Sequence, residues 1–276
     1  MLELMYITNR PDIAQIADSA GVDRVWIDLE TKDKEKRQKN MDTVKSHHSI
    51  SDIKTIKPLL RSAKLQVRVN HIYEDSKSEI DEVIKAGADY IMLPYYKTVS
   101  EVKRFIDFVR GRSKTILLLE TVEAMDILDD TLALPGIDEM HIGLNDLHLS
   151  LKQDFMFESV ANGIVDDLCS QIRAANIPYG FGGIARIGEG LIPAEMVLNE
   201  HYRLGSTRAI LSRSFCMPTP DQSADEIRML FSKELLAIRE YEKQISGWSP
   251  DILNAKHIEF QNAVSSVVNT IRQQKG

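Results

Sequence analysis

Two carboxylates at the ends of apolar runs are the residues of this chain best placed for chemistry. Glu120 ends the run Leu117-Leu-Leu-Glu, and Asp146 lies in Ile142-Gly-Leu-Asn-Asp-Leu. Such runs are typical of strands buried in a parallel sheet. The two positions are one strand–helix–strand unit apart, so we expect both at neighbouring strand ends. Paired oxygen ligands there favour a divalent cation such as Mg²⁺ or Mn²⁺ over a purely structural carboxylate pair.

Arg68 is the third candidate, because it lies between two valines in Val67-Arg-Val-Asn. A buried arginine requires an anion. One interpretation is a structural ion pair with Asp28 or Glu30, which end another apolar run. The other is that its planar fork holds a substrate carboxylate or a developing enolate oxygen beside the metal.

The segment Thr31–Ser51 is long, polar and charged, which is typical of a functional or mobile loop. Its adjacent histidines, His47 and His48, are candidate general bases, because a histidine titrates near neutral pH. The alternative is that they are solvated loop residues. The basic positions at 32, 34, 36, 37 and 39 form a solvated face or attract an anionic substrate.

Further polar residues are expected at strand ends, and several well-known motifs are absent. Asn145 follows the sixth expected strand, and Ser212 lies near the end of the eighth. The run Gly180-Phe-Gly-Gly leaves room for a ligand but fails the dinucleotide-binding spacing. The chain has no phosphate-binding loop and no nucleophile elbow. Lys97 lies in a loop and is a weak candidate for a Schiff base.

Short apolar runs alternate with amphipathic segments along the chain, and this alternation predicts parallel strands joined by helices. Eight such units predict an α/β fold of the (β/α)₈ barrel type. The expected strands are Leu4–Thr8, Arg24–Leu29, Gln66–Asn70, Tyr90–Pro94, Thr115–Glu120, Glu139–Gly143, Tyr179–Gly183 and Ala209–Arg213. The expected helices include Asp12–Ala20, Lys77–Ala86, Val99–Arg110, Phe157–Ala175 and Pro193–Leu204.

The C-terminal segment contains two further helix patterns, Ala224–Ile245 and Asp251–Gln273. We therefore expect a barrel core over residues 1–220 and C-terminal helices over 221–276. The first helix closes the barrel. The second is surplus to it, and such a helix usually covers a neighbouring element or binds a partner subunit.

Composition and charge exclude several classes of protein. A net charge of −7 and a pI of about 5.6 argue against nucleic-acid binding. No apolar stretch is long enough to cross a membrane, and the N-terminus lacks a signal peptide, so we expect a cytoplasmic protein without a membrane partner. Cys169 and Cys216 are expected as buried free thiols.

The chain resembles the HpcH/HpaI aldolase/citrate lyase family of pyruvate/phosphoenolpyruvate barrels. The order and spacing of several phrases carry the resemblance, clearly from Ala20 to Ser150 and more loosely to Phe215. The phrases are Gly21-Val-Asp-Arg-Val-Trp-Ile-Asp-Leu-Glu30, Val67-Arg-Val-Asn70, Ala86-Gly-Ala-Asp-Tyr-Ile-Met-Leu-Pro94, Glu120-Thr-Val-Glu-Ala124 and Pro135-Gly-Ile-Asp138 through Leu147.

The resemblance implies roles for the candidate residues. Glu120 and Asp146 would be the protein ligands of the divalent metal, and Arg68 would hold the keto or enolate oxygen of pyruvate. Backbone amides near Asn145 and Asp146, and near Ser212, would hold the substrate carboxylate. A histidine in the loop after the second strand often acts as base in this family, which points to His47 or His48. Terminal helices commonly exchange between barrels of the family, so the resemblance implies a homo-oligomer.

The chain also departs from the family pattern. Leu118 stands where aldolases of the family often have glutamine, and Pro94-Tyr95 stands where the citrate lyase branch often has Pro-Lys. The form Asp28-Leu-Glu30 is closer to the lyase branch, and Thr31–Ser51 is typical of neither. These changes indicate a divergent branch.

The predicted function is a divalent-metal-dependent (class II) aldolase or carbon–carbon lyase that forms a pyruvate-type enolate. Its partners would be a 2-oxo acid, similar to pyruvate or oxaloacetate, and an aldehyde or thioester. One alternative is a lyase for an acyl-CoA similar to malyl-CoA or citramalyl-CoA. The other is a barrel without catalysis that serves as a binding or assembly subunit.

Overall fold

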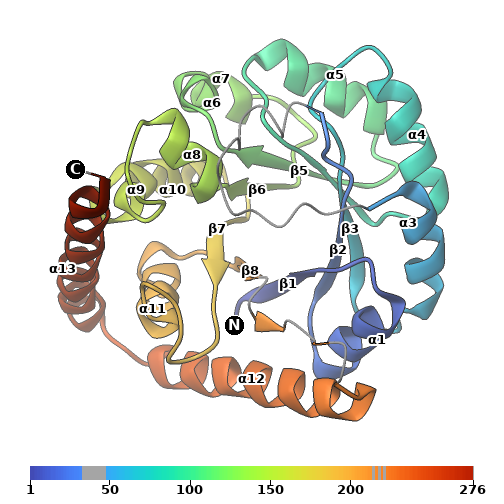
Figure 1. The fold of residues 1–276 in the computed structure, drawn as a ribbon. Helices are drawn as coiled ribbons and strands as arrows, with labels where there is room; N and C mark the ends of the chain where they lie inside the picture. Colours follow the sequence, from blue (N-terminus) through green and yellow to red (C-terminus); the bar gives the residue numbers. More distant parts are fainter. Residues whose placement is uncertain (33–47, 213–214, 217–218, 220–221, 276) are drawn as a thin grey trace.

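A computed structural model describes residues 1–32, 48–212, 215–216, 219 and 222–275. Eight parallel strands close into a barrel in the order β1 to β8, and β8 pairs with β1 (Figure 1). The (β/α)₈ prediction is confirmed. The strands are β1 (Glu3–Ile7), β2 (Arg24–Asp28), β3 (Lys64–Arg68), β4 (Tyr90–Leu93), β5 (Lys114–Leu119), β6 (Glu139–Ile142), β7 (Tyr179–Ile184) and β8 (Arg208–Leu211).

Helices surround the barrel, and the main apolar core lies between them and the strands (Figure 1). A smaller apolar cluster, which includes Met5, Trp26 and Leu118, fills the barrel interior. The helices are α1 (Pro11–Ala20), α3 (Ile50–Ile56), α4 (Ser76–Ala86), α5 (Val99–Val109), α6 (Val122–Asp126), α7 (Leu128–Leu132), α8 (Leu144–Ser150), α9 (Glu158–Ala161), α10 (Ile164–Ala174), α11 (Ala194–Leu204), α12 (Ala224–Ile245) and α13 (Pro250–Lys275), with a 3₁₀ turn η1 (Lys57–Leu59).

A repeated Gly-x-Asp turn sets where helices stop and strands start. Gly87 ends α4 with φ 107°, a left-handed conformation that glycine adopts without steric cost. Two residues later, the Asp89 carboxylate accepts a hydrogen bond of 2.7 Å from the backbone N–H of Leu65 on β3. Asp23 does the same for Leu4 on β1 at 2.8 Å. These turns therefore fix the start of each strand against its neighbour.

The single helix expected over Phe157–Ala175 is wrong. The segment forms two helices, α9 and α10, separated by Asn162 and Gly163. Gly163 has φ 89°, which is outside the helical region, and it begins the second helix. The Asn-Gly pair is a turn signal that the apolar periodicity obscured.

The N-terminal end of the barrel interior is closed by a network of buried charges. Arg24 on β2 donates two hydrogen bonds to Glu139 on β6, at 2.7 and 2.8 Å. Arg208 on β8 donates to the same carboxylate at 2.9 Å, and Arg24 also contacts Glu3. Because β2 and β6 stand on opposite walls, this network crosses the interior and closes it below the apolar cluster.

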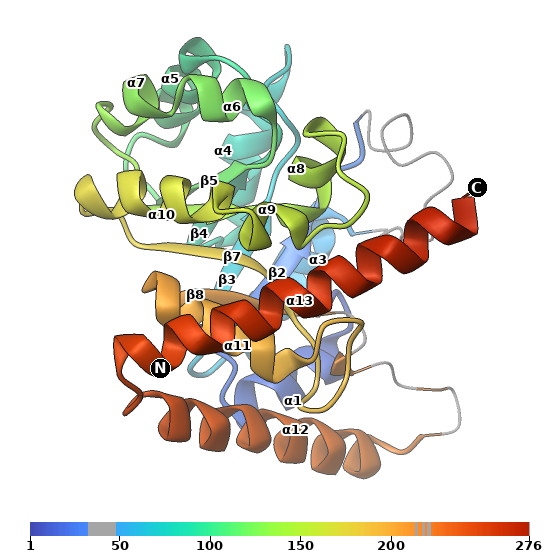
Figure 2. The same ribbon diagram turned by 90° about the vertical axis from the view of Figure 1, so that its left-hand side faces the viewer.

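The two C-terminal helices pack on the barrel in different ways. The helix α12 packs on α1 and α11 in the outer ring of helices. The helix α13 runs outside that ring, across α11 and α9 (Figure 2). It buries Phe260, Val264 and Val268 against its own chain. That it also binds a partner subunit stays a prediction.

Two smaller expectations concern the cysteines and membrane insertion. Cys169 and Cys216 are both buried and free, as expected. No helix in the described ranges is both long and apolar enough to span a bilayer.

Candidate active site

Arg68 and Asp28 form a fork-to-carboxylate pair at the C-terminal ends of β3 and β2. Nε of Arg68 donates to Oδ1 of Asp28 at 2.9 Å, and Nη2 donates to Oδ2 at 2.8 Å. Glu30 Oε2 lies 3.5 Å from the same Nη2. Burial lowers the pKa of a guanidinium, but the two carboxylates outweigh it and hold the pKa of Arg68 well above its ordinary value. Arg68 is therefore a permanent, oriented cation at the barrel mouth.

The structural ion pair predicted for Arg68 is therefore present, but it does not use all the N–H donors of the guanidinium. A guanidinium has five N–H donors, and Asp28 takes two of them. The pairing fixes the plane of the fork. This leaves the substrate-binding interpretation open.

Glu120 follows β5 and is almost fully buried, with 2% of its surface exposed. Its Oε1 accepts a hydrogen bond of 2.9 Å from the backbone N–H of Tyr95, which follows β4. Its Oε2 lies against Gly143, where a Cβ would come within 2.8 Å of that oxygen. One oxygen therefore accepts a hydrogen bond from an amide. The other lies so close to Gly143 that a side chain at position 143 would displace it.

Asp146 and Asn145 lie in the first turn of α8, directly after β6, and both are half-buried. The backbone N–H of Gly143 donates to the carbonyl of Leu119 at 2.9 Å, so the ends of β5 and β6 are joined there. Glu120 and Asp146 therefore lie at the ends of neighbouring strands. Their oxygen donors suit a hard divalent cation. A pair of carboxylates leaves other coordination positions for water or substrate.

Three buried carboxylates of the described residues lie around Arg68 at this end of the barrel. Asp28, Glu30 and Glu120 are each at most 3% exposed, and all three raise the pKa of Arg68 through their charge. Buried carboxylates that lie near one another favour a nearby cation. The described residues contain no group of three or more His, Cys, Asp or Glu that could hold a metal alone. A cation here would complete its shell with other ligands.

Of the two candidate bases, His48 lies beside the site. Its Nδ1 accepts a hydrogen bond of 2.9 Å from the backbone N–H of Asp28. A neutral imidazole that accepts at Nδ1 carries its proton at Nε2. In this arrangement His48 presents a donor, and it acts as a base only after the Asp28 bond is released. His47 lies outside the described residues.

Ser212 follows β8, and its backbone N–H donates to the carbonyl of Ile184 at 2.8 Å. That amide is therefore committed to the barrel wall. A contact with a substrate carboxylate would have to come from the Ser212 side chain or from a neighbouring residue. Arg213 and Ser214 lie outside the described residues.

Three contributors to this end of the barrel were not identified in the sequence. They are the backbone amide of Tyr95, Gly143, which has no side chain to displace Glu120, and His141 on β6. His141 is 1% exposed, and neither of its ring nitrogens has a hydrogen-bond partner in the described chain. Alternation would have found His141, because it lies two positions before Gly143. No sequence signal marks the Tyr95 amide.

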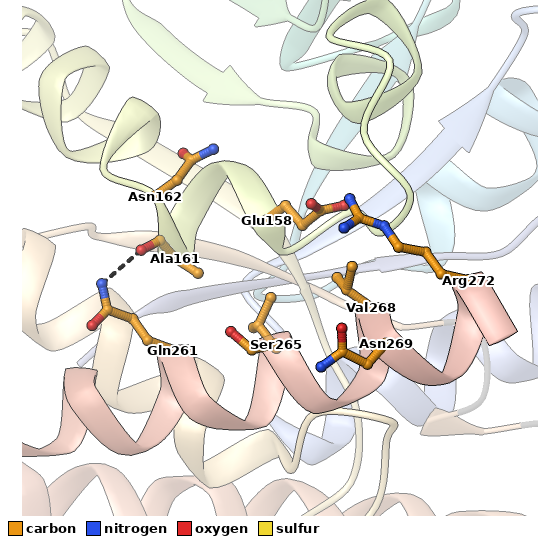
Figure 3. A pocket seen from close by; sticks show the side chains of 9 residues that line it. Glu158, Ala161, Asn162, Gln261, Ser265, Val268, Asn269 and Arg272 are labelled. Carbon is orange, nitrogen blue, oxygen red and sulfur yellow. Dashed lines mark hydrogen bonds between the residues drawn. The ribbon is translucent and has the colours of Figure 1, made fainter.

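A separate groove of about 430 Å³ lies on the outside of the barrel, between α9 and α13 (Figure 3). Gln261 donates from Nε2 to the carbonyl of Ala161 at 2.7 Å along its wall. Most of its other polar lining is uncharged Asn and Ser, with Glu158 and Arg272 also lining it. It brings no catalytic cluster together, so the strand ends remain the candidate site.

Known structures share this fold. An HpcH/HpaI aldolase from Desulfitobacterium hafniense is 14% identical, with a TM-score of 0.59 over 87% of this chain and 93% of its own. A family protein from Burkholderia cenocepacia is also 14% identical, with a TM-score of 0.60 over 89% and 95%. A citrate lyase from Burkholderia xenovorans is 14% identical, with a TM-score of 0.57 over 88% of this chain and 83% of its own. No curated protein was found to match the sequence.

The family model for HpcH/HpaI aldolase/citrate lyase matches residues 3–175, which include all of β1 to β6 and the candidate residues on them. The match covers well over half of the chain. The chain belongs to the HpcH/HpaI aldolase/citrate lyase family.

Proposed function

We propose that this protein is a divalent-metal-dependent aldolase or carbon–carbon lyase that acts on a 2-oxo acid through a pyruvate-type enolate. The observation that carries the proposal is the position of two carboxylates, Glu120 and Asp146, at the ends of the neighbouring strands β5 and β6, at the same end of the barrel as Arg68. Such oxygen donors suit a bound Mg²⁺ or Mn²⁺. Membership in an aldolase and lyase family supports the same reaction class.

The chain's own residues divide the work. Glu120 and Asp146 would hold the cation, which supplies Lewis-acid stabilisation of negative charge on the substrate oxygens. Arg68 is fixed by Asp28 and directs its remaining N–H donors toward an oxygen on which charge develops. Such preorganised donors stabilise the transition state because they need no reorganisation during the reaction. Backbone amides near Asn145 and Asp146, in the first turn of α8, would bind the substrate carboxylate.

The proton on the partner carbon's hydroxyl group requires a base. His48 can take this role only when its Nδ1 is released from the Asp28 amide, since Nε2 carries the proton in the observed arrangement. We therefore propose separate His47→Ala and His48→Ala variants. A wild-type cleavage rate in both variants would exclude this loop as the source of the base.

Proton exchange tests the enolate chemistry without knowledge of the second substrate. Deuterium uptake by pyruvate in D₂O is followed by mass spectrometry, with Mn²⁺ or with a chelator. We expect uptake into the methyl group only with metal. The Arg68→Lys variant keeps the charge but loses the planar fork, and we expect a slower exchange. Exchange that is equally fast with the chelator, or absent in all conditions, contradicts the proposal.

The second substrate is proposed as an aldehyde, with a thioester as the alternative. Lys32 is the one described member of the basic run, and its Nζ lies 4.0 Å from the ring centroid of Tyr73. Its charge is thus already engaged with an aromatic face, which does not favour a binding site for coenzyme A phosphates. Competition of free coenzyme A with cleavage separates the two. A chain that binds neither Mg²⁺ nor Mn²⁺ in calorimetry would instead be a barrel without this catalysis.

The assembly is proposed as a homo-oligomer formed through the C-terminal helices. Large apolar side chains are exposed on their outer faces: Met229 and Leu236 on α12, and Ile258 on α13. Sedimentation velocity at several concentrations tests this. A monomer at all of them contradicts the proposal.

A further inference from the structure

The turn after β4 contains an unusual backbone conformation beside the candidate site. Tyr95 has φ 50°, in the left-handed region that a bulky aromatic residue rarely adopts. No glycine or asparagine occupies the position. Strain of this kind persists only where the surrounding structure enforces it, and it occurs most often at functional sites.

The surroundings of Tyr95 hold the turn on both sides. Tyr96 is 1% exposed and belongs to the main core. Its carbonyl accepts a hydrogen bond of 3.2 Å from Oγ1 of Thr121, the residue after Glu120. On the far side, Thr98 and Glu101 form a capping box that begins α5. The turn is therefore fixed to both the core and the segment that carries Glu120.

The strained conformation directs the Tyr95 N–H at Oε1 of Glu120, 2.9 Å away. The second carboxylate oxygen, Oε2, lies against Gly143, which follows β6. We infer that the Tyr95 backbone is a positioning group: its amide occupies one oxygen of Glu120 and presents the other as a single-oxygen ligand for the cation. This inference rests on the proposed function and deepens it.

The inference separates the backbone of Tyr95 from its side chain. If the amide is what matters, residues that accept a left-handed conformation and keep the N–H should preserve metal binding. The variants Tyr95→Gly and Tyr95→Asn meet both conditions. If the ring is what matters, both variants should fail. The ring itself is half-buried and lies near Lys97 Nζ, 5.1 Å from its centroid.

Replacing the backbone amide at position 95 with an ester removes the N–H and keeps the ring. The α-hydroxy analogue of tyrosine can be introduced at one position by suppression of a stop codon. The matched control is the same analogue at Tyr73, whose N–H donates to Oγ of Ser76 at 2.8 Å instead of to a candidate ligand. Both proteins are titrated with Mn²⁺ by calorimetry. The Mn²⁺ concentration for half-maximal pyruvate exchange is measured beside kcat at saturating Mn²⁺.

We expect the ester at position 95 to weaken Mn²⁺ binding by about tenfold or more, in the range typical for groups that orient a metal ligand. The half-maximal Mn²⁺ concentration rises by a similar factor, while kcat at saturating Mn²⁺ falls less. The ester at Tyr73 and the variants Tyr95→Gly and Tyr95→Asn stay within about threefold of wild type, a change well below that range.

Two results overturn the inference in distinguishable ways. Tight Mn²⁺ binding by wild type that is unchanged in the position-95 ester contradicts the positioning role and leaves the proposed function intact. No Mn²⁺ binding by the wild-type protein contradicts the proposed function itself, and the positioning role with it.

Discussion

The two ends of the barrel interior both contain buried charges, in different proportions among the described residues. At the N-terminal end, Arg24 and Arg208 face Glu139 and Glu3, two charges of each sign. At the C-terminal end, Arg68 lies among three carboxylates of the described residues. The first arrangement is an ion-pair network that closes one end. We propose the second as part of a metal site.

The pairing geometry supports the same distinction. At the N-terminal end the guanidinium groups of Arg24 and Arg208 converge on one carboxylate, so Glu139 is saturated with donors from two strands. At the C-terminal end one oxygen of Glu120 is held by an amide, and the other faces a glycine. The first arrangement is an ion-pair network within the described chain, whereas in the second we propose that the oxygen facing Gly143 binds a cation. Changes at the two ends should therefore affect different properties.

The largest expected effect is on stability at the N-terminal end. Glu139→Gln leaves two buried guanidinium groups with one half-exposed carboxylate, and breaking a buried pair in this way typically costs about 3–5 kcal/mol. Urea denaturation should show this loss, with metal binding unchanged. Glu3→Gln is the control. Because the Glu3 side chain is 43% exposed, we expect this substitution to lower the free energy of unfolding by less than about 1 kcal/mol. Equal losses in the two variants would contradict the structural role of Glu139.

For Glu120→Gln at the C-terminal end, we expect loss of activity and of metal binding without loss of stability. The amide oxygen of glutamine can still accept the Tyr95 N–H, but the charge that binds a cation is lost. Loss of such electrostatic stabilisation typically lowers kcat by about 10²–10³-fold, or roughly 3–4 kcal/mol. Stability without metal should stay constant or rise, because one buried charge is removed. Wild-type turnover and Mn²⁺ affinity in this variant would rule out the assigned ligand.

His141 lies between the two ends and should make the barrel sensitive to acid. Burial lowers its pKa to about 3, assisted by the positive charges of Arg24, Arg208 and Arg68. The unfolded chain has the ordinary value, so between about pH 6.5 and 3 the unfolded state binds more protons than the folded state. Its contribution is present in full above pH 6.5 and is lost as pH falls. At pH 5 the loss is about 2 kcal/mol.

Denaturation at pH 7 and pH 5 measures this effect. His201, whose pKa burial also lowers to about 3, should contribute a similar loss. The variant His141→Met should therefore lose about 2 kcal/mol less than wild type between the two pH values. Other titrating groups cancel in this difference. An identical pH dependence for wild type and variant would show that His141 does not titrate in this way.

The fold followed from the sequence because parallel strands are buried on both faces and appear as apolar runs. Every predicted strand begins within two residues of the observed one. The break at Gly163 was missed, since both flanking helices carry apolar residues at helical spacing. For the site, the carboxylate ends of β2 and β5 and the arginine of β3 were identified, because strand ends meet at one mouth in a barrel.

Other features of the two ends depend on contacts between residues that are far apart in the sequence, which local sequence patterns do not predict. The N-terminal network joins residues on opposite walls, although alternation from Asp28 back to Arg24 shows that Arg24 faces inward. The Nδ1 contact of His48 depends on how a long loop returns to the barrel. The left-handed Tyr95 has no glycine or asparagine to mark it. Such contacts require the three-dimensional structure.

The smallest expected effect tests the room beside Glu120. Gly143 has φ −85° and ψ 84°, and without left-handed strain an alanine is tested mainly by the space it needs. In Gly143→Ala the new Cβ would lie 2.8 Å from Oε2 of Glu120, so the carboxylate must move. We expect Mn²⁺ affinity to fall by roughly tenfold, about 1.4 kcal/mol. The control Gly183→Ala meets only the Ile210 carbonyl at 3.6 Å, an ordinary contact, and should bind Mn²⁺ as wild type does. If both variants bind Mn²⁺ with the same affinity, the space at Gly143 does not determine metal binding. The two ends of the barrel then differ only in their charged residues.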